Sequence, residues 1–164
     1  MDGNFGAFCE GGGELTASNF LRIASVLSIF NCAGHTTGVF SAPRHGAAEI
    51  AVVETMKSYH LDVMGSMRSY WDFLFGYGLS VTITLLVQAT LFWQLAALAK
   101  RNLACTRAIA GLFFFNCIGI AIVSWKYFFI GPAVSQLLIA ACLGVAFVRA
   151  SPPVTLSQEA AQLN

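Results

Sequence analysis

Four long apolar runs constrain the fold of this chain more than any other feature. They cover residues 19–40, 71–99, 103–129 and 130–148. A helix of roughly 20 apolar residues crosses the hydrocarbon core of a membrane, and it satisfies its own backbone hydrogen bonds there. The sequence lacks the short alternating strands that are typical of a membrane β-barrel. It therefore predicts an all-α fold, a four-helix transmembrane bundle.

The composition agrees with a membrane protein and narrows the function classes. Only 10% of the residues are charged and 57% are hydrophobic, whereas charged residues make up roughly a quarter of a soluble domain. The Lys and Arg residues are scattered, so nucleic acid is not expected as a partner. The cysteines and histidines do not have the spacing of a metal site, and there is no glycine-rich nucleotide loop. We expect no metal and no cofactor, and interpret the cysteines as small core residues.

The chain divides into three parts. Residues 1–18 and 150–164 are predicted to be disordered tails on either side of a membrane domain at 19–149. The first 17 residues contain acidic residues but no Lys or Arg, which is the opposite of the basic start of a signal peptide. We therefore interpret the N-terminal segment as a tail.

A link of about thirty residues joins the first two apolar runs. After a turn at "SAPRHG", apolar residues recur at spacings of three and four from Ile50 to Met67, with charged residues between them. This pattern predicts an amphipathic helix that links spans one and two at the membrane interface. The other connections are shorter: a polar turn at Lys100–Asn102 and a break at Gly131–Pro132.

The positions of Lys and Arg predict the orientation of the bundle. One end carries the following basic residues: Arg22, Lys100, Arg101, Arg107 and Arg149. The other end carries Arg44, Lys57, Arg68 and Lys126. Because Lys and Arg are enriched on the cytoplasmic side, we predict a multi-pass membrane protein with both termini in the cytoplasm. The sequence does not specify which membrane.

Polar side chains are concentrated in one half of the predicted bundle. Late residues of spans one and three lie level with early residues of spans two and four, which brings these residues to the half facing the link: His35, Asp72, Tyr77, Asn116, Trp125, Lys126 and Gln136. An ionisable group at mid-membrane costs on the order of 2.5–3.5 kcal/mol, so such groups usually face a bundle interior or a wet cavity. This asymmetry predicts a polar pocket that opens towards the link.

Within that pocket, His35 and Asp72 are the candidate catalytic residues. An imidazole suits proton transfer at neutral pH, and a carboxylate can orient it. Tyr77 and Asn116 would support them. Arg68 and Asp72 are four residues apart and would pair on a helix, which either anchors the chain at the membrane edge or holds Asp72 ionised beside His35.

The remaining candidates are substrate-binding residues and a helix contact. Arg68, Phe73, Trp125 and Lys126 are the predicted substrate-binding residues, although the aromatic ones and Lys126 also fit an interfacial belt. Gly34 and Gly38 form a GxxxG pattern in the first span, which predicts the close approach of another helix beside His35.

Three motifs resemble a family of small, uncharacterised four-span membrane proteins that are mainly bacterial. They are "GHT" at residues 34–36, "DVMGSMRSYWDFLFGYG" at 62–78 and "SWKYFF" at 124–129. The resemblance implies a four-helix membrane topology. It implies no established activity.

Two functions remain open at this point. The first is an enzyme that uses acid–base chemistry, an isomerisation, cyclisation or hydrolysis, on a lipophilic substrate. The second is a non-catalytic membrane subunit that binds lipid or a partner. The expected partners are membrane lipids or a lipophilic small molecule, and a homodimer is left open. A transporter fits less well, because four spans without a pair of broken helices leave little room for alternating access.

Overall fold

The computed structural model of the chain describes residues 16–41 and 46–150. Its elements, in order, are α1 (Ala17–Val39), α2 (Ala47–Ser58), β1 (His60–Val63), β2 (Ser66–Ser69), α3 (Tyr70–Leu98), α4 (Leu103–Tyr127) and α5 (Ile130–Arg149). The first two residues of α1, 17 and 18, belong to the predicted N-terminal tail. The remaining tail residues, 1–15 and 151–164, and most of the predicted turn at "SAPRHG" lie outside the described residues.

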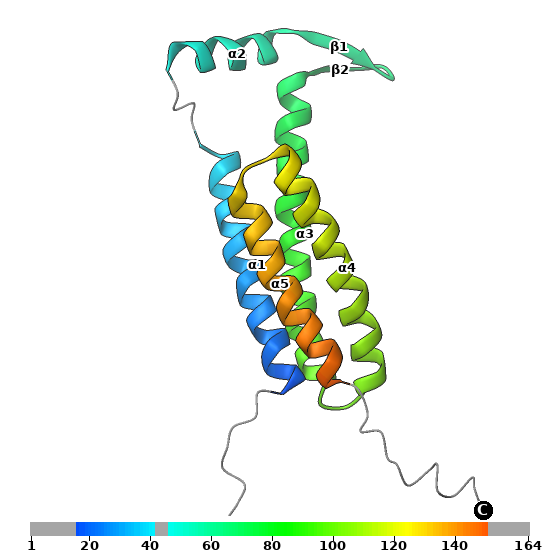
Figure 1. Ribbon diagram of the computed structural model, residues 1–164. Coiled ribbons are helices and arrows are strands. Elements are labelled where there is room, and N and C mark those ends of the chain that lie inside the picture. The colour runs from blue at the N-terminus through cyan, green and yellow to red at the C-terminus, as the bar shows by residue number, and fades with distance from the viewer. Residues whose placement is uncertain (1–15, 42–45, 151–164) are drawn as a thin grey trace, which may run out of the picture.

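Four of the helices, α1, α3, α4 and α5, form an antiparallel bundle (Figure 1). α1 packs against both α3 and α5, and α5 also packs against α4, whereas α3 and α4 touch little. The start of α1, the α3–α4 turn and the end of α5 lie at one end of the bundle. We call it the basic end, because it carries five basic residues: Arg22, Lys100, Arg101, Arg107 and Arg149. α2 and the β-hairpin lie at the other end.

Three of these helices are suited to a membrane. α3, α4 and α5 are long and apolar enough to cross it. α1 is 23 residues long, but it does not meet the same standard of apolar composition. The chain therefore has the helices of an integral membrane protein, and the fourth span remains a prediction.

The tightly packed core lies in the half of the bundle near the basic end. It is rich in small side chains, with alanines from α1, α3 and α5 around Leu21, Phe92, Ile139 and Leu143. The rings of Phe92 and Phe113 meet edge to face at 5.2 Å and join α3 to α4. Alanine lets helix backbones approach closely, and close packing is a main source of helix association in lipid.

Small polar side chains of α1 bind the backbone of α3 at regular intervals. The Ser18 hydroxyl donates to the Ala96 carbonyl at 2.8 Å, and the Ser25 hydroxyl donates to the Ala89 carbonyl at 2.7 Å. The Cys32 thiol continues the series and donates to the Thr82 carbonyl, with 3.5 Å between the Sγ and the oxygen. Donors and acceptors each recur every seven residues, the repeat that keeps one face of a helix against its neighbour.

The link between α1 and α3 differs from the predicted helix. α2 ends at Ser58, and residues 60–69 form an antiparallel hairpin in which His60 pairs with Ser69 and Val63 with Ser66. The prediction of one helix from Ile50 to Met67 is therefore wrong in its second half. None of the α2 residues is fully buried, and the amphipathic character of this helix remains a prediction.

The turn of the hairpin explains why the helix does not continue. Met64 and Gly65 both have positive φ values, 54° and 83°, as a two-residue hairpin turn of type I′ requires. The Asp62 carboxylate accepts a hydrogen bond from the Gly65 N–H at 2.8 Å. Apolar Leu61 and Val63 alternate with exposed residues along β1, so a spacing of two replaces the helical spacing here.

Two glycine predictions also need correction. No described atom lies within 4 Å of a Cβ added at Gly34 or Gly38, so the GxxxG pattern does not mark a close contact between the described helices of the chain. The close approach occurs instead at Gly78 of α3, where an added Cβ would lie 2.8 Å from the Val39 side chain.

The break between α4 and α5 also differs from its predicted place. Gly131 and Pro132 lie in the first turn of α5, where proline is tolerated. The chain breaks earlier, at Phe128 and Phe129.

We predict that Gly78→Ala destabilises the bundle relative to Gly76→Ala. Both changes replace a glycine of α3, and each gains about 1 kcal/mol of helix propensity. Only the Gly78 variant meets Val39, since no atom of the described residues lies within 4 Å of a Cβ added at Gly76. Overpacking costs about 1–3 kcal/mol, so the Gly78 variant should unfold at a lower temperature in detergent. Equal melting temperatures would contradict the contact between α1 and α3 at this level.

Candidate functional site

His35 joins α1 to α3. Its Nε2 lies 3.0 Å from the carbonyl oxygen of Gly78 and its side chain is partly buried. Gly78 is buried and has no side chain, which lets the imidazole reach the backbone. The Thr36 hydroxyl, next in sequence, lies 3.3 Å from the Thr82 hydroxyl one turn further along α3. The imidazole thus extends the series of contacts made by Ser18, Ser25 and Cys32.

Asp72 caps the first turn of α3. Its Oδ2 accepts a hydrogen bond from the Ser69 N–H at 2.8 Å, and the Ser69 hydroxyl accepts one from the Asp72 N–H at 3.2 Å. This reciprocal pair is a capping box, which satisfies backbone N–H groups that have no partner inside the helix. The carboxylate therefore has a structural task at the start of α3.

Arg68 does not pair with Asp72 as predicted. It lies in β2, before α3 begins, so the two residues are not one helical turn apart. Its Nη1 donates to the carbonyl of the adjacent Met67 at 3.1 Å. In the described part of the chain, the ion pair is between Lys57 and Glu54, at 3.1 Å.

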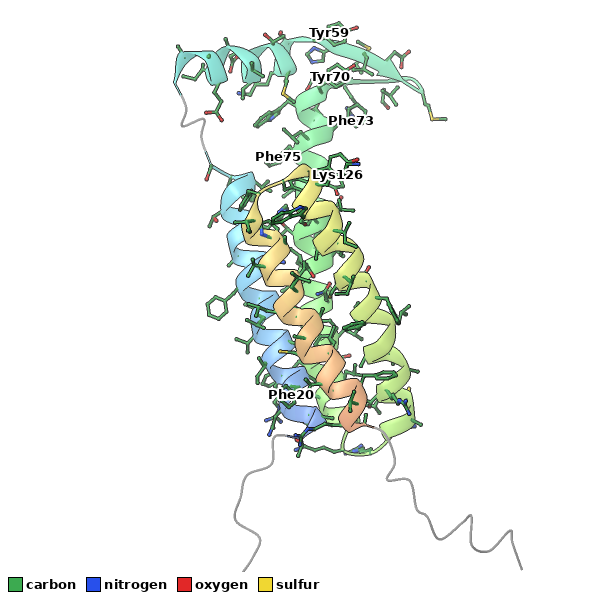
Figure 2. All side chains as sticks on the ribbon, viewed as in Figure 1. Phe20, Tyr59, Tyr70, Phe73, Phe75 and Lys126 are labelled. Atoms are coloured by element: carbon green, nitrogen blue, oxygen red, sulfur yellow. The ribbon has the colours of Figure 1, made fainter. Side chains whose placement is uncertain are left out.

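The other predicted site residues lie on the surface of the isolated chain. Tyr77 is 64% exposed, Trp125 is 71% exposed and Phe73 is 48% exposed. Asn116 is exposed too. The Lys126 ammonium lies 5.1 Å from the centre of the adjacent Tyr127 ring. Figure 2 shows Phe73 near the projecting start of α3 and Lys126 at the end of α4, on separate helices.

The structure therefore brings His35 to α3, but not into a cluster with the other candidates. Gly78 lies six residues after Asp72, so His35 is about 9 Å from the level of Asp72 along the helix axis. Tyr77 is next to Gly78, but one residue turns the side chain by about 100°. Within residues 16–41 and 46–150, no three His, Cys, Asp or Glu side chains gather as metal ligands would.

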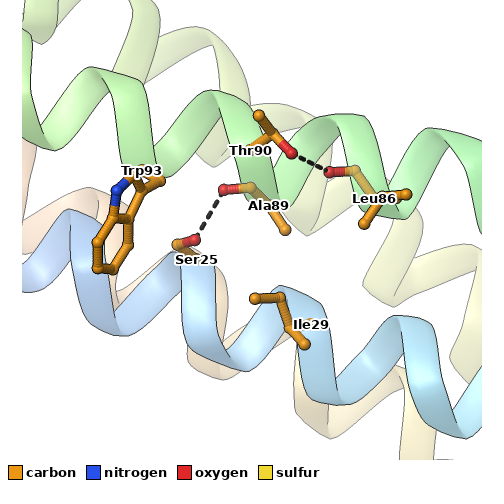
Figure 3. A pocket seen from close by; sticks show the side chains of 6 residues that line it. All are labelled: Ser25, Ile29, Leu86, Ala89, Thr90 and Trp93. Atoms are coloured by element: carbon orange, nitrogen blue, oxygen red, sulfur yellow. Dashed lines mark hydrogen bonds between the residues drawn. The ribbon is translucent and has the colours of Figure 1, made fainter.

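A hollow lies elsewhere, on the outer surface between α1 and α3. This groove has a volume of about 210 Å³ and is lined by Ser25, Ile29, Leu86, Ala89, Thr90 and Trp93 (Figure 3). Its two hydroxyl groups donate to backbone carbonyls: Ser25 to Ala89 at 2.7 Å, and Thr90 to Leu86 at 2.9 Å. The groove therefore presents an apolar surface, with small residues as its floor and larger ones as its walls.

Two buried amides lie deeper in the bundle. The Gln88 Nε2 is 3.4 Å from the Ser28 hydroxyl, which itself donates to the Ala24 carbonyl. Gln136 on α5 is only 2% exposed, and its Oε1 has no hydrogen-bond partner among the described residues. The contact between Gln88 and Ser28 joins α3 to α1, and neither glutamine lines the groove.

The sequence interpretation missed the groove residues. Ser25, Ala89 and Thr90 are ordinary members of apolar helices, and neither their type nor their position distinguishes them. The signal that could have identified the α1–α3 contact is the seven-residue spacing of Ser18, Ser25 and Cys32. Even so, this spacing would have indicated the contact and not the hollow beside it.

We predict that His35→Ala lowers the stability of the bundle in detergent. The variant loses a hydrogen bond between two helices, which contributes about 1 kcal/mol. Thr37→Ala is the matched control, because the exposed Thr37 hydroxyl donates only to Gly34 of its own helix, and a change of less than about 0.5 kcal/mol is expected there. Chemical unfolding of the two variants tests this. A His35 variant as stable as the Thr37 variant would leave the imidazole available for another role.

Comparison with known proteins gives no further guide to this arrangement: no family model, no curated protein and no solved structure matches the chain. The family resemblance of the three sequence motifs therefore stays a prediction. The function rests on the fold and on the two kinds of site described above, the dispersed polar residues and the apolar groove.

Proposed function

We propose that this chain is a non-catalytic, four-span membrane protein that binds a lipid acyl chain in the groove between α1 and α3. The observation that carries the proposal is the contrast between the two kinds of site. The candidate acid–base groups, His35 and Asp72, are engaged in contacts that hold the fold together. The hollow is lined by an apolar surface and opens outward.

The contacts of α1 support its role as the fourth span. It has about the same length as its neighbours, about 35 Å at 1.5 Å per residue. It contacts α3 from Ser18 to His35, so it crosses the membrane if α3 does. Its polar side chains lower its hydropathy, but several of them bind α3 and are turned away from lipid. Composition therefore underestimates how well α1 fits a membrane.

The element formed by α2 and the hairpin fits the membrane interface. α3 has 29 residues and is about 44 Å long, which exceeds a hydrocarbon thickness of about 30 Å. Its first turns therefore reach the headgroup region. There Tyr59 stacks on Tyr70 at 5.8 Å, and the Lys57 ammonium lies 5.3 Å from the Trp71 ring. Aromatic and Lys side chains are typical of that depth.

The orientation of the bundle in the membrane is inferred from the positions of Lys and Arg, as it was from the sequence. The basic end carries Arg22, Lys100, Arg101, Arg107 and Arg149, and we propose that it faces the cytoplasm. The groove lies between this end and the middle of the bundle, since Ser25 and Ile29 are about 12 and 18 Å along α1 from Ala17. An acyl chain from the cytoplasmic leaflet would reach it directly.

A lipid acyl chain fits the groove better than a polar substrate. Both hydroxyl groups of the lining already donate to backbone carbonyls, so neither hydroxyl has a free donor for a polar substrate. An acyl chain needs no hydrogen bonds and gains dispersion contacts with Ile29, Leu86 and Trp93. The acid–base enzyme remains the alternative, and it would require substrate beside His35.

We predict that Thr90→Phe reduces the phospholipid that co-purifies with the protein at least severalfold. Thr90 lines the groove and is exposed, so a phenyl ring can fill the hollow without entering the core. Thr84→Phe is the control, because Thr84 is also an exposed threonine of α3 whose hydroxyl donates one turn back, to Ser80. Native mass spectrometry of the purified protein measures the bound lipid. A wild-type protein without bound lipid, or equal loss in both variants, would contradict the proposal.

A further inference from the structure

The groove has a cation at one end. The Arg22 guanidinium lies 5.3 Å from the centre of the Trp93 ring, and Trp93 is one of the groove residues. Arg22 precedes Ser25 by one helical turn and is exposed. A guanidinium stacked on an aromatic ring is held in place, and its N–H donors still point outward in a fork that suits a phosphate.

The charge of Arg22 is not neutralised by a carboxylate in the described ranges. The acidic residues there are Glu49, Glu54, Asp62 and Asp72, and all of them lie in α2, the hairpin or the first turn of α3, at the opposite end of the bundle. The basic end also carries Lys100, Arg101, Arg107 and Arg149. Among the described residues, a negative group would therefore meet a positive field at this end.

The depth of Arg22 matches the phosphate of a lipid whose tail lies in the groove. It is five residues from the start of α1, about 8 Å along the helix. A long Arg side chain at that depth extends to the headgroups, and the neighbouring Trp93 is typical of the interface. From Arg22 to Ile29 the groove and its cation extend along about 10 Å of α1, so headgroup and tail contacts are continuous.

We infer that the groove and Arg22 together form a binding site for an anionic phospholipid, an inference that rests on the proposed acyl-chain site. Arg22 binds the phosphate, and one acyl chain lies against Ile29, Ala89 and Leu86. A zwitterionic lipid carries its own cation beside the phosphate, so it gains less from the field of the basic end. The site therefore selects an anionic headgroup.

The test compares two arginines of the basic end that each contact the face of an aromatic ring. Arg22 stacks on Trp93 beside the groove, and Arg107 stacks on Phe147, at 4.5 Å, away from the groove lining. The full chain is purified in detergent and incubated with equal amounts of phosphatidylglycerol and phosphatidylcholine that have the same acyl chains. Native mass spectrometry then gives the ratio of the two bound lipids for the wild type, Arg22→Gln, Arg22→Lys and Arg107→Gln.

We expect the wild type to favour phosphatidylglycerol and Arg22→Gln to reduce this preference about fivefold, the effect of one cation at a charged membrane surface. Arg22→Lys should retain most of the preference and Arg107→Gln all of it. No preference in the wild type, or equal loss in Arg22→Gln and Arg107→Gln, would overturn the anionic site but leave acyl-chain binding intact. Loss of both lipids would be the failure of the groove itself, which Thr90→Phe detects separately.

Discussion

The series of hydrogen bonds from α1 to the backbone of α3 is the interaction on which the bundle depends. Ser18, Ser25 and Cys32 each reach a carbonyl of α3, at Ala96, Ala89 and Thr82, and both sets are seven residues apart. In lipid, apolar burial gives little drive for helix association, so packing and interhelical hydrogen bonds carry more of it. These donors are small, and they can therefore hold the two backbones close together. α1 then offers its other side to α5, which places α4 at the edge of the bundle.

The same contact produces the groove. Where Ser25 meets Ala89, two small residues bring the helices together, and the larger Ile29, Leu86 and Trp93 surround them. A small floor between larger walls leaves a hollow on the outer surface. Arg22 precedes Ser25 by one turn of α1, and its guanidinium stacks on the Trp93 ring. The groove and its cation are thus consequences of how α1 and α3 pack, and no separate loop or insertion is needed to build them.

Much of the fold could be predicted from the sequence, because span length and hydrophobicity are strong constraints. The three apolar helices, the antiparallel order and the short turn at Lys100 all follow from them. The hairpin could not be predicted as easily. Its apolar residues have spacings that also fit a helix, and the decision depends on the left-handed backbone of Met64 and Gly65. Met64 is an unusual residue for that conformation, and only the glycine beside it indicated a turn.

The candidate site was harder to predict, because depth in a membrane says nothing about the direction of a side chain. The sequence placed His35 level with Tyr77 along the bundle axis, and its hydrogen-bond partner, Gly78, is the residue next to Tyr77. One residue along a helix nevertheless changes the direction by about 100°, which turns Tyr77 outward while Gly78 faces α1. Asp72 shows the second difficulty: its spacing from Arg68 suited an ion pair, but its spacing of three from Ser69 suited a capping box, and the end of β2 decided between them. A polar residue in a membrane helix first has to satisfy its own hydrogen bonds. In this chain the fold itself meets that need for His35 and Asp72, so their presence alone does not indicate catalysis.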